Sequence, residues 1–502
     1  MQDVKHEWQR RLRMQMASAV LASVPTLLVA GSPDSTLAQE IKEVSSEALV
    51  EVQVEGILED DALSSQADIA TLLPRKIDPR RSLFVTELDA LEPFSLERVM
   101  DQLASQTGEA GLTGIALFQQ LWDTQNPGPG LGRGAHCDDH VNDDGQTSLN
   151  SYPYDCRPAP GEGSQAQCRS FSDASCRYQP VAVVNRFDLA TADANFCGEY
   201  RIIHAKEGAG TFDRNFIIWE ASMPNPFPAL GAQGCRRLAT YWGLLSRISN
   251  LQARKRWLER LFFEGLYGAQ PVVHIDHYGH NGDGQVRTNQ FIGQQNAPIW
   301  TLREFRLTDR SGSWRLDPTP DAVNPWGGLF SPTADHEALA QFIKWLPSQL
   351  GNLSADELND IFMSVPSRFN SGQSHSSVSI DTNYLAQLGT ASSPLRSAIQ
   401  DALDASQSDL TVENIVARAQ TQSCAGCHQL SNDADLGRGM RWPRSAQFTH
   451  VDERSTETSP EGHLRFVISP ALTDVFLPAR KRNLESYLFR NTRAPAVAGA
   501  VN

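Results

Sequence analysis

The sequence lacks an excess of positive charge. It carries 44 Lys and Arg against 59 Asp and Glu, a net charge of −15 over 502 residues. Its best basic run, Arg480-Lys481-Arg482, is too short to follow a phosphate backbone. Because nucleic-acid binding depends on neutralising phosphates with Lys and Arg, we expect no nucleic-acid partner.

The sequence also lacks the short signatures of common enzyme classes. It contains no G-x-S-x-G, no P-loop, no dinucleotide-binding fingerprint, no H-E-x-x-H and no internal repeat. With 40% hydrophobic and 21% charged residues, its composition is that of a globular protein with a core. Its length predicts two or three packed units.

Long apolar runs are confined to the beginning of the sequence. A positively charged head precedes 14–33, a stretch without charged side chains, and small residues at 36–38 suit cleavage. A retained membrane anchor is the alternative, although Pro25 and the many Ala and Ser residues count against it. We therefore expect 1–38 to be a signal peptide, the protein to be periplasmic or secreted, and no stable membrane anchor to remain.

Cysteine is scarce as well, with eight in the chain. Two lie at 424 and 427, and six fall in or near a Gly-, Pro- and Asp-rich loop at 124–180: Cys137, Cys156, Cys168, Cys176, Cys197 and Cys235. An even number in an exported chain favours three disulfides, although six cysteines allow about 15 pairings. A metal cluster is the alternative, because His136 and His140 flank Cys137.

The periodicity of the sequence predicts an α+β fold, with helices and a mostly antiparallel sheet. Ser95 is the expected N-cap of a helix. Two further helices are expected at 235–248 and 253–266, and the expected strands are 180–189, 198–206, 214–222, 271–279, 284–292 and 299–307. After 330 the pattern becomes helical, with a capping box at Ser354 and Glu357 and an N-cap at Ser393.

These patterns divide the sequence into four regions. The signal peptide at 1–38 precedes an α+β domain at 39–330 that includes the Cys-rich loop 124–180. A helical segment at 331–407 follows, and the polar residues at 404–409 mark the expected boundary of a small all-α domain at 408–502.

The most specific motif is "CAGCH", formed by Cys424, Cys427 and His428. C-x-x-C-H is the attachment sequence of a c-type haem: each thiol adds to one vinyl group, and the imidazole becomes the proximal iron ligand. A thiol-redox pair would need a surrounding βαβ pattern, which is missing, and a zinc site would need a second nearby cysteine pair. We expect one covalent haem c.

The surroundings of the motif resemble the small class I cytochrome c domain. A predicted helix at 411–428 runs into the motif and another at 476–489 ends the region. The resemblance covers roughly residues 409–490 and implies that the first and last helices cross and hold the haem between them. It also implies that a proline carbonyl, here that of Pro443, accepts the proximal imidazole N–H.

The resemblance leaves the second iron ligand open. The family normally has a methionine shortly before the last helix, and this sequence has none there. Met440 and His463 are the candidates, with His450 or a residue of the large domain as alternatives. A methionine ligand would favour electron transfer, whereas an open iron would permit ligand binding or peroxide chemistry.

Two weaker patterns lie in the large domain. His274, Asp276, His277, His280 and Asp283 either bind a metal or belong to a hairpin turn at "GHNGDG". Opposed charges at Arg186, Asp188, Glu199 and Arg201 form either a structural network across two strands or a substrate site.

Together these observations predict an exported mono-haem c-type cytochrome protein that transfers electrons with a redox partner protein or a small-molecule donor or acceptor. The alternatives are a haem-dependent oxidoreductase, acting on peroxide or a small molecule, and a non-enzymatic, disulfide-stapled binding protein with a structural haem. Whether the protein is an enzyme stays open in the sequence.

Overall fold

The elements described below come from a computed structural model, which describes residues 76–123, 145–155, 164–210, 214–266, 268–280, 283–292, 299–376 and 382–489. The predicted signal peptide, Cys137, Cys156, His136 and His140 lie outside the described residues, as does most of the loop 124–180.

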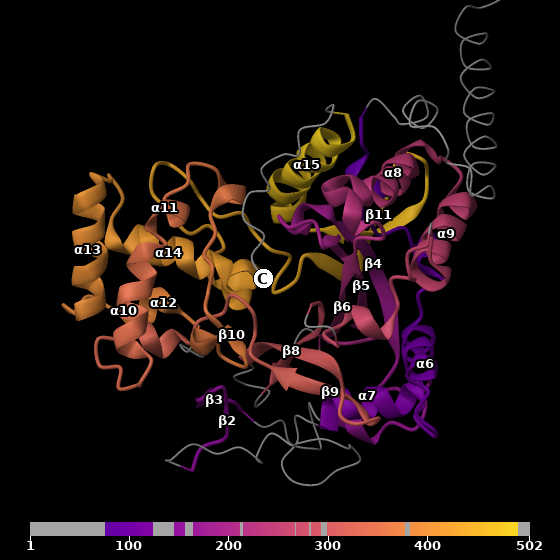
Figure 1. Cartoon of the computed structure of the whole chain (residues 1–502), viewed down its shortest axis with the longest axis horizontal. Coiled ribbons are helices and arrows are strands. Elements are labelled where there is room, and N and C mark those ends of the chain that lie inside the picture. The colour runs from indigo at the N-terminus through magenta and orange to yellow at the C-terminus, as the bar shows by residue number, and fades with distance from the viewer. Residues whose placement is uncertain are drawn as a thin grey trace, which may run out of the picture. The chain divides into compact units, whose positions relative to one another are not determined.

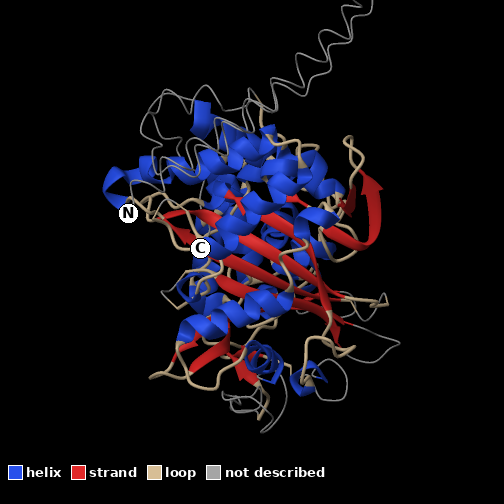
Figure 2. Ribbon diagram, turned by 90° about the vertical axis from the view of Figure 1, so that its right-hand side faces the viewer, coloured by secondary structure: helices blue, strands red, loops and turns tan. Residues whose placement is uncertain are grey.

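A sheet of eight strands is the central element of the described part of the chain (Figure 2). Its strand order is β1-β4-β5-β6-β7-β8-β10, with β9 also paired to β8, and all neighbours are antiparallel. The strands are β1 (Phe84–Val85), β4 (Tyr178–Arg186), β5 (Phe196–Lys206), β6 (Asn215–Pro224), β7 (Gln285–Ile292), β8 (Ile299–Asp309), β9 (Trp314–Thr319) and β10 (Ser374–Ser376). The α+β prediction is confirmed.

Five of the six predicted strands are present in this sheet. The prediction of a strand at 271–279 is wrong, because the structure has a short 3₁₀ turn there, Ile275–His277. The sequence pattern that suggested a strand has another cause here. Val272, Val273 and His277 are all buried, so the segment is packed on more than one side. Burial of a short apolar run does not distinguish a strand from a turn.

The two faces of the sheet differ in chemistry. Successive residues of β5 point to opposite faces, so Tyr200, Ile202 and His204 share an apolar face. There Tyr200 meets Trp242 of helix α8 (Arg236–Leu244), with ring centroids 5.3 Å apart. The opposite face carries Glu199 and Arg201. One face of the sheet therefore packs into the core, and the other carries charged side chains.

His204 makes the stability of the apolar face dependent on pH. It is fully buried and its Nε2 lies 2.7 Å from the carbonyl of Phe94. Burial lowers its pKa from 6.5 to about 4. Between these two pH values His204 is protonated in the unfolded chain and neutral in the folded protein. The contribution of His204 to the free energy of unfolding therefore falls as the pH drops from 6.5 towards 4.

We therefore expect His204→Gln, which keeps an N–H donor but does not titrate, to flatten this dependence. Between pH 7 and pH 5 the wild type should lose about 2 kcal/mol more than the variant. Urea unfolding at the two pH values measures the difference. Equal losses in both proteins would show that His204 is protonated without penalty.

The helices form two groups. The first flanks the sheet and the second, α10–α14, lies together away from α6–α9 (Figure 1). Their bounds are α4 (Pro79–Ser82), α5 (Leu88–Leu91), α6 (Leu96–Thr107), α7 (Gly114–Asp123), α8, α9 (Leu251–Glu259), α10 (Leu339–Ser348), α11 (Leu350–Leu353), α12 (Tyr384–Leu388), α13 (Pro394–Ser406), α14 (Val412–Gln422) and α15 (Leu477–Phe489). Ser95 and Ser393 cap α6 and α13, as predicted. The capping box at Ser354 is wrong: only a 3₁₀ turn, η8 (Leu358–Asp360), follows it.

The predicted boundary at 404–409 does not separate two cores. Leu403 on α13 and Leu410, Val412 and Ile415 on or before α14 belong to one buried hydrophobic cluster with residues from α10–α12. The polar segment is the tight turn between α13 and α14, with Gln407 at a φ of 52°. Helix α14 is therefore the last helix of the helical group.

The region after α14 also differs from an all-α domain. It contains an antiparallel hairpin, β11 (Val451–Thr458) and β12 (Leu464–Ile468). Helix α15 packs against α8 and α4, whereas α14 packs against α11, α12 and α13. The class I resemblance implies that α14 and α15 cross. That pair is not among the packed pairs of the described helices.

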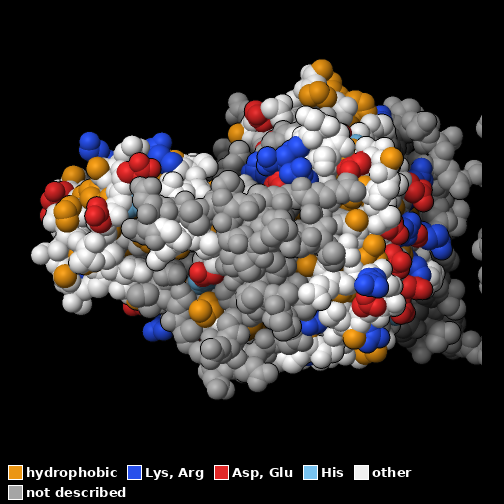
Figure 3. Space-filling view, turned by 90° about the horizontal axis from the view of Figure 1, so that it is seen from below, with side chains coloured by type: hydrophobic (Ala, Val, Ile, Leu, Met, Phe, Trp, Pro, Cys, Tyr) orange, Lys and Arg blue, Asp and Glu red, His pale blue; other side chains and the backbone are white. Residues whose placement is uncertain are grey.

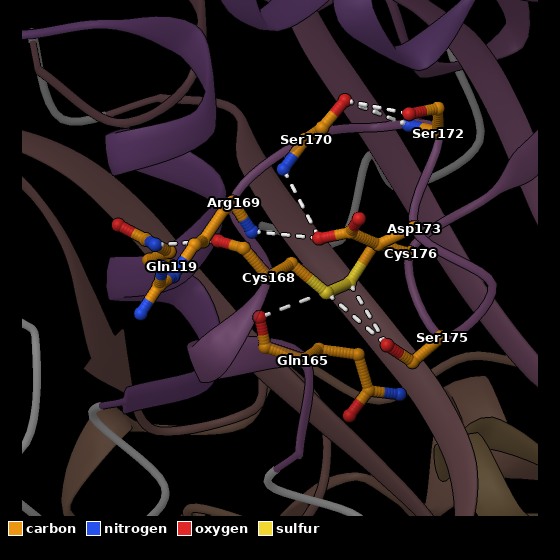
Figure 4. Close-up of a disulfide and its surroundings, with 9 residues drawn as sticks. All are labelled: Gln119, Gln165, Cys168, Arg169, Ser170, Ser172, Asp173, Ser175 and Cys176. Atoms are coloured by element: carbon orange, nitrogen blue, oxygen red, sulfur yellow. Dashed lines mark hydrogen bonds between the residues drawn. A yellow bond between two sulfur atoms is a disulfide. The ribbon is translucent and has the colours of Figure 1, made fainter.

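Two of the expected disulfides lie within the described residues. Cys168 pairs with Cys176 across a sharp turn (Figure 4), and Cys197 on β5 pairs with Cys235 beside α8. The sequence separations are 8 and 38 residues. The second disulfide ties the sheet to the helix that covers its apolar face.

Loop entropy predicts different costs for the two disulfides. Replacement of Cys197 and Cys235 by alanine should lower the free energy of unfolding by about 4 kcal/mol, and that of Cys168 and Cys176 by about 2.5 kcal/mol. Urea denaturation of both double variants measures this. Equal losses would contradict a chain-entropy origin.

Acidic and basic side chains are intermixed over the described part of the face drawn in Figure 3. No helix among the described residues is both long enough and apolar enough to cross a membrane.

Candidate functional site

The C-x-x-C-H motif forms a turn directly after α14. That helix begins at the N-cap Thr411, which forms a capping box with Asn414. It ends at Ser423, where the hydroxyl donates to the carbonyl of Gln420 and accepts from Gly426 N. The chain then closes a π-helical turn, η10 (Gly426–Leu430). A Cβ at Gly426 would lie 1.7 Å from the carbonyl oxygen of Gln420, so this turn requires glycine.

Both motif thiols are unpaired and partly buried. Cys427 Sγ lies 3.4 Å from Nε2 of His450. Burial raises the pKa of Cys427 to about 11 and also raises that of Cys424. The thiolate is the nucleophile in cysteine chemistry, so burial disfavours the reactive form of both thiols.

The imidazole of His428 is held from two sides. Its Nδ1 lies 2.9 Å from the carbonyl oxygen of Phe448, and its ring stacks on Trp300 of β8 with centroids 5.1 Å apart. Burial lowers its pKa to about 4. Since a carbonyl can only accept, Nδ1 carries the proton and Nε2 keeps a lone pair for a metal. The acceptor is thus Phe448 and not Pro443, the residue that the resemblance implied.

The candidates for a second iron ligand are scattered. Met440 packs against the helical core, and His463 lies in the turn of the β11–β12 hairpin. Neither is among the described residues that line the cavity beside the motif. His450 does line it, but its ring contacts that of His428, with centroids 4.9 Å apart. Two rings in contact leave no room for a porphyrin between them.

The motif opens onto a cavity of about 1060 Å³, just above the usual range for ligand pockets. Cys424, Cys427 and His428 form one wall. The charged face of the sheet forms another, and α15 with the π-helical turn η11 (Ala471–Phe476) contributes a third. Elements from both helical groups and from the sheet therefore meet at this site.

The charged wall is a ladder of alternating signs that crosses four strands. Arg201 on β5 lies opposite Glu220 on β6, and Arg287 on β7 lies opposite Glu304 on β8. Glu220 is 2.9 Å from both Arg201 and Arg287, and Glu304 is 2.9 Å from Arg287. Glu220 and Glu304 are buried, so each carboxylate depends on its guanidinium partners.

The four charged residues noted in the sequence join this wall. Arg186 pairs with Asp188 at 2.9 Å, and Arg201 also pairs with Glu199. All four line the cavity, so the structural network and the candidate binding site are the same residues. Sequence reasoning missed Glu220, Arg287 and Glu304, although charges at alternate positions of apolar strands were a usable signal.

One cation of the cavity is poorly compensated. Arg480 on α15 reaches Asp188 at 3.8 Å, but Arg186 already binds that carboxylate. Burial and the neighbouring charge of Arg186 lower the pKa of Arg480 to about 9. An anionic group in this corner of the cavity would be stabilised.

The described side chains of the histidine-rich segment at 274–283 contact one another and the backbone. His274 Nδ1 lies 3.4 Å from Asp276, and His277 faces the carbonyl of Val272 at 3.1 Å. Within the described ranges, no group of three or more His, Cys, Asp or Glu side chains is arranged to hold a metal ion.

The residues of the cavity fit a covalently held haem. Two unpaired thiols and an imidazole with its Nε2 lone pair available line one wall, and Arg480 offers a counter-charge for a carboxylate such as a haem propionate. The fit concerns the attachment chemistry and not the class I fold. Comparison with protein-family models, curated proteins and solved structures finds no match.

Proposed function

We propose that the protein is an exported mono-haem c-type cytochrome protein that transfers electrons. One observation carries this proposal: the two unpaired thiols and the available imidazole of a single C-x-x-C-H motif line the same large cavity. The export signal read at 1–38 supports a location in the periplasm or outside the cell, where haem c is attached.

A bound haem would supply one-electron chemistry at its iron. The residues of this chain would do the rest. Cys424 and Cys427 would tether the ring, and His428 would offer Nε2 to the iron. The carbonyl of Phe448 fixes the tautomer of that imidazole. Trp300 would support the His428 ring by stacking on it, and Arg480 would balance negative charge in the cavity.

A haem-dependent oxidoreductase is the second candidate, and one observation favours it. The described residues that line the cavity include no methionine. A site without a strong second ligand leaves an iron position open to small molecules.

Two measurements test these proposals. Protein made in a host with haem-attachment machinery should have an intact mass increased by one haem and a pyridine haemochrome spectrum of thioether-bound haem. A colourless chain with both thiols free or joined to each other would overturn both candidates. If haem is present, slow or absent carbon monoxide binding to the reduced protein supports electron transfer, and rapid binding supports the oxidoreductase.

A further inference from the structure

A buried arginine clamps the loop that supports His428. Arg214, next to the start of β6, is 3% exposed. Its guanidinium binds the carboxylate of Glu453 on β11, with contacts of 2.8 and 2.5 Å. It also donates to the carbonyl of Gln447 at 2.6 Å and to the hydroxyl of Thr449 at 3.0 Å. The residue between these two partners is Phe448, the acceptor for His428.

The backbone at this point would not hold its shape alone. Gln447 has a φ of 55° and Phe448 a φ of 73°, in the left-handed region that non-glycine residues avoid. Such conformations persist where the surroundings fix them, and they occur most often at functional sites. Here the fixing groups are the Arg214 fork and the Phe448 ring, which packs 5.0 Å from Phe291.

We infer that the Arg214–Glu453 pair is a positioning device for the proximal histidine, which it controls through the Phe448 carbonyl. This inference rests on the proposed haem function and adds to it two residues that do not line the cavity. Groups that accept the second N–H of a metal-bound histidine orient the ring and raise its basicity. A more basic imidazole stabilises ferric over ferrous iron and lowers the reduction potential.

Two variants loosen the clamp in different ways. Arg214→Lys keeps the charge but replaces the planar fork with a single ammonium. The double variant R214M/E453M removes both charges together, and apolar replacement of a buried ion pair is often tolerated in stability. The matched control is R254M/E87M. Arg254 and Glu87 also form a buried ion pair, with 2.9 Å between them, and neither residue lines the cavity.

The experiment is a redox titration of each haem-loaded protein, with the Fe–His stretch followed by resonance Raman. We expect both clamp variants to keep one covalent haem. Their ferric–ferrous equilibrium should shift roughly tenfold towards ferrous, which raises the reduction potential by about 59 mV. Their Fe–His stretch should be weaker. The control should leave both values unchanged.

The outcomes separate this inference from the proposed function. A wild-type chain without haem overturns the proposed function. Haem-loaded clamp variants with the wild-type potential and Fe–His stretch overturn the positioning role and leave the haem assignment intact. The same holds if the control shifts the potential as far as the clamp variants do.

Discussion

Replacement of both Cys424 and Cys427 by alanine is expected to abolish covalent haem completely. Each thiol can form one thioether, and no other unpaired cysteine lies among the described residues. In a maturation-competent host, the wild type should keep its haem through extraction with acidified organic solvent. The double variant should release whatever haem it binds, and its intact mass should equal that of the bare chain.

The single variants sharpen this result. Cys424→Ala and Cys427→Ala should each retain one thioether and therefore keep haem through the same extraction, at reduced yield. The matched control is the Cys197/Cys235 double alanine variant, which also removes two sulfurs but far from the motif in the chain. It should be less stable and still carry haem. Covalent haem in the 424/427 double variant would place the attachment at other residues.

The sheet was predictable from the sequence because its strands have a dominant apolar face. In β5, the alternation of Tyr200 and Ile202 with Glu199 and Arg201 reflects two faces with different neighbours. The hairpin β11–β12 was not predicted, since "VDERSTET" is polar at nearly every position and only Val451 and Glu453 have the low exposure of a packed face.

The domain boundaries were harder, for a physical reason. A polar segment such as 404–409 is required in any exposed turn between helices, and the sequence does not say whether the helices beyond it share a core. Leu403 and Leu410 lie on either side of that turn and pack in one cluster. Tertiary packing, which depends on residues far apart in the sequence, decides this question.

The candidate site was predictable only in its local part. The C-x-x-C-H motif identifies three neighbouring residues, and the structure adds partners from two other segments. Trp300 and Phe448 hold His428 from β8 and from the loop before β11, 128 and 20 residues away in sequence. A carbonyl acceptor carries no sequence signature, so the choice between Pro443 and Phe448 needed coordinates.

Replacement of Glu220 by glutamine is expected to destabilise the protein. Glu220 is 1% exposed and accepts from Arg201 and Arg287, so its loss leaves two guanidiniums facing each other across β6. Burial alone would raise its pKa, but these two cations hold the pKa below the usual value. Unpairing a buried charge costs about 3–5 kcal/mol. The lower part of that range applies, because neither guanidinium is left without a carboxylate: Arg201 keeps Glu199 and Arg287 keeps Glu304. Both arginine side chains also retain some exposure.

Urea unfolding at pH 7 measures this cost, with Asp356→Asn as the matched control. Asp356 also pairs with an arginine, Arg438 at 2.7 Å, but its side chain is 81% exposed, so the same change should cost less than about 1 kcal/mol. If Glu220→Gln proved no more costly than the control, water in the cavity would already screen the ladder. The charges of the wall would then contribute little to stability and would be available to bind a ligand.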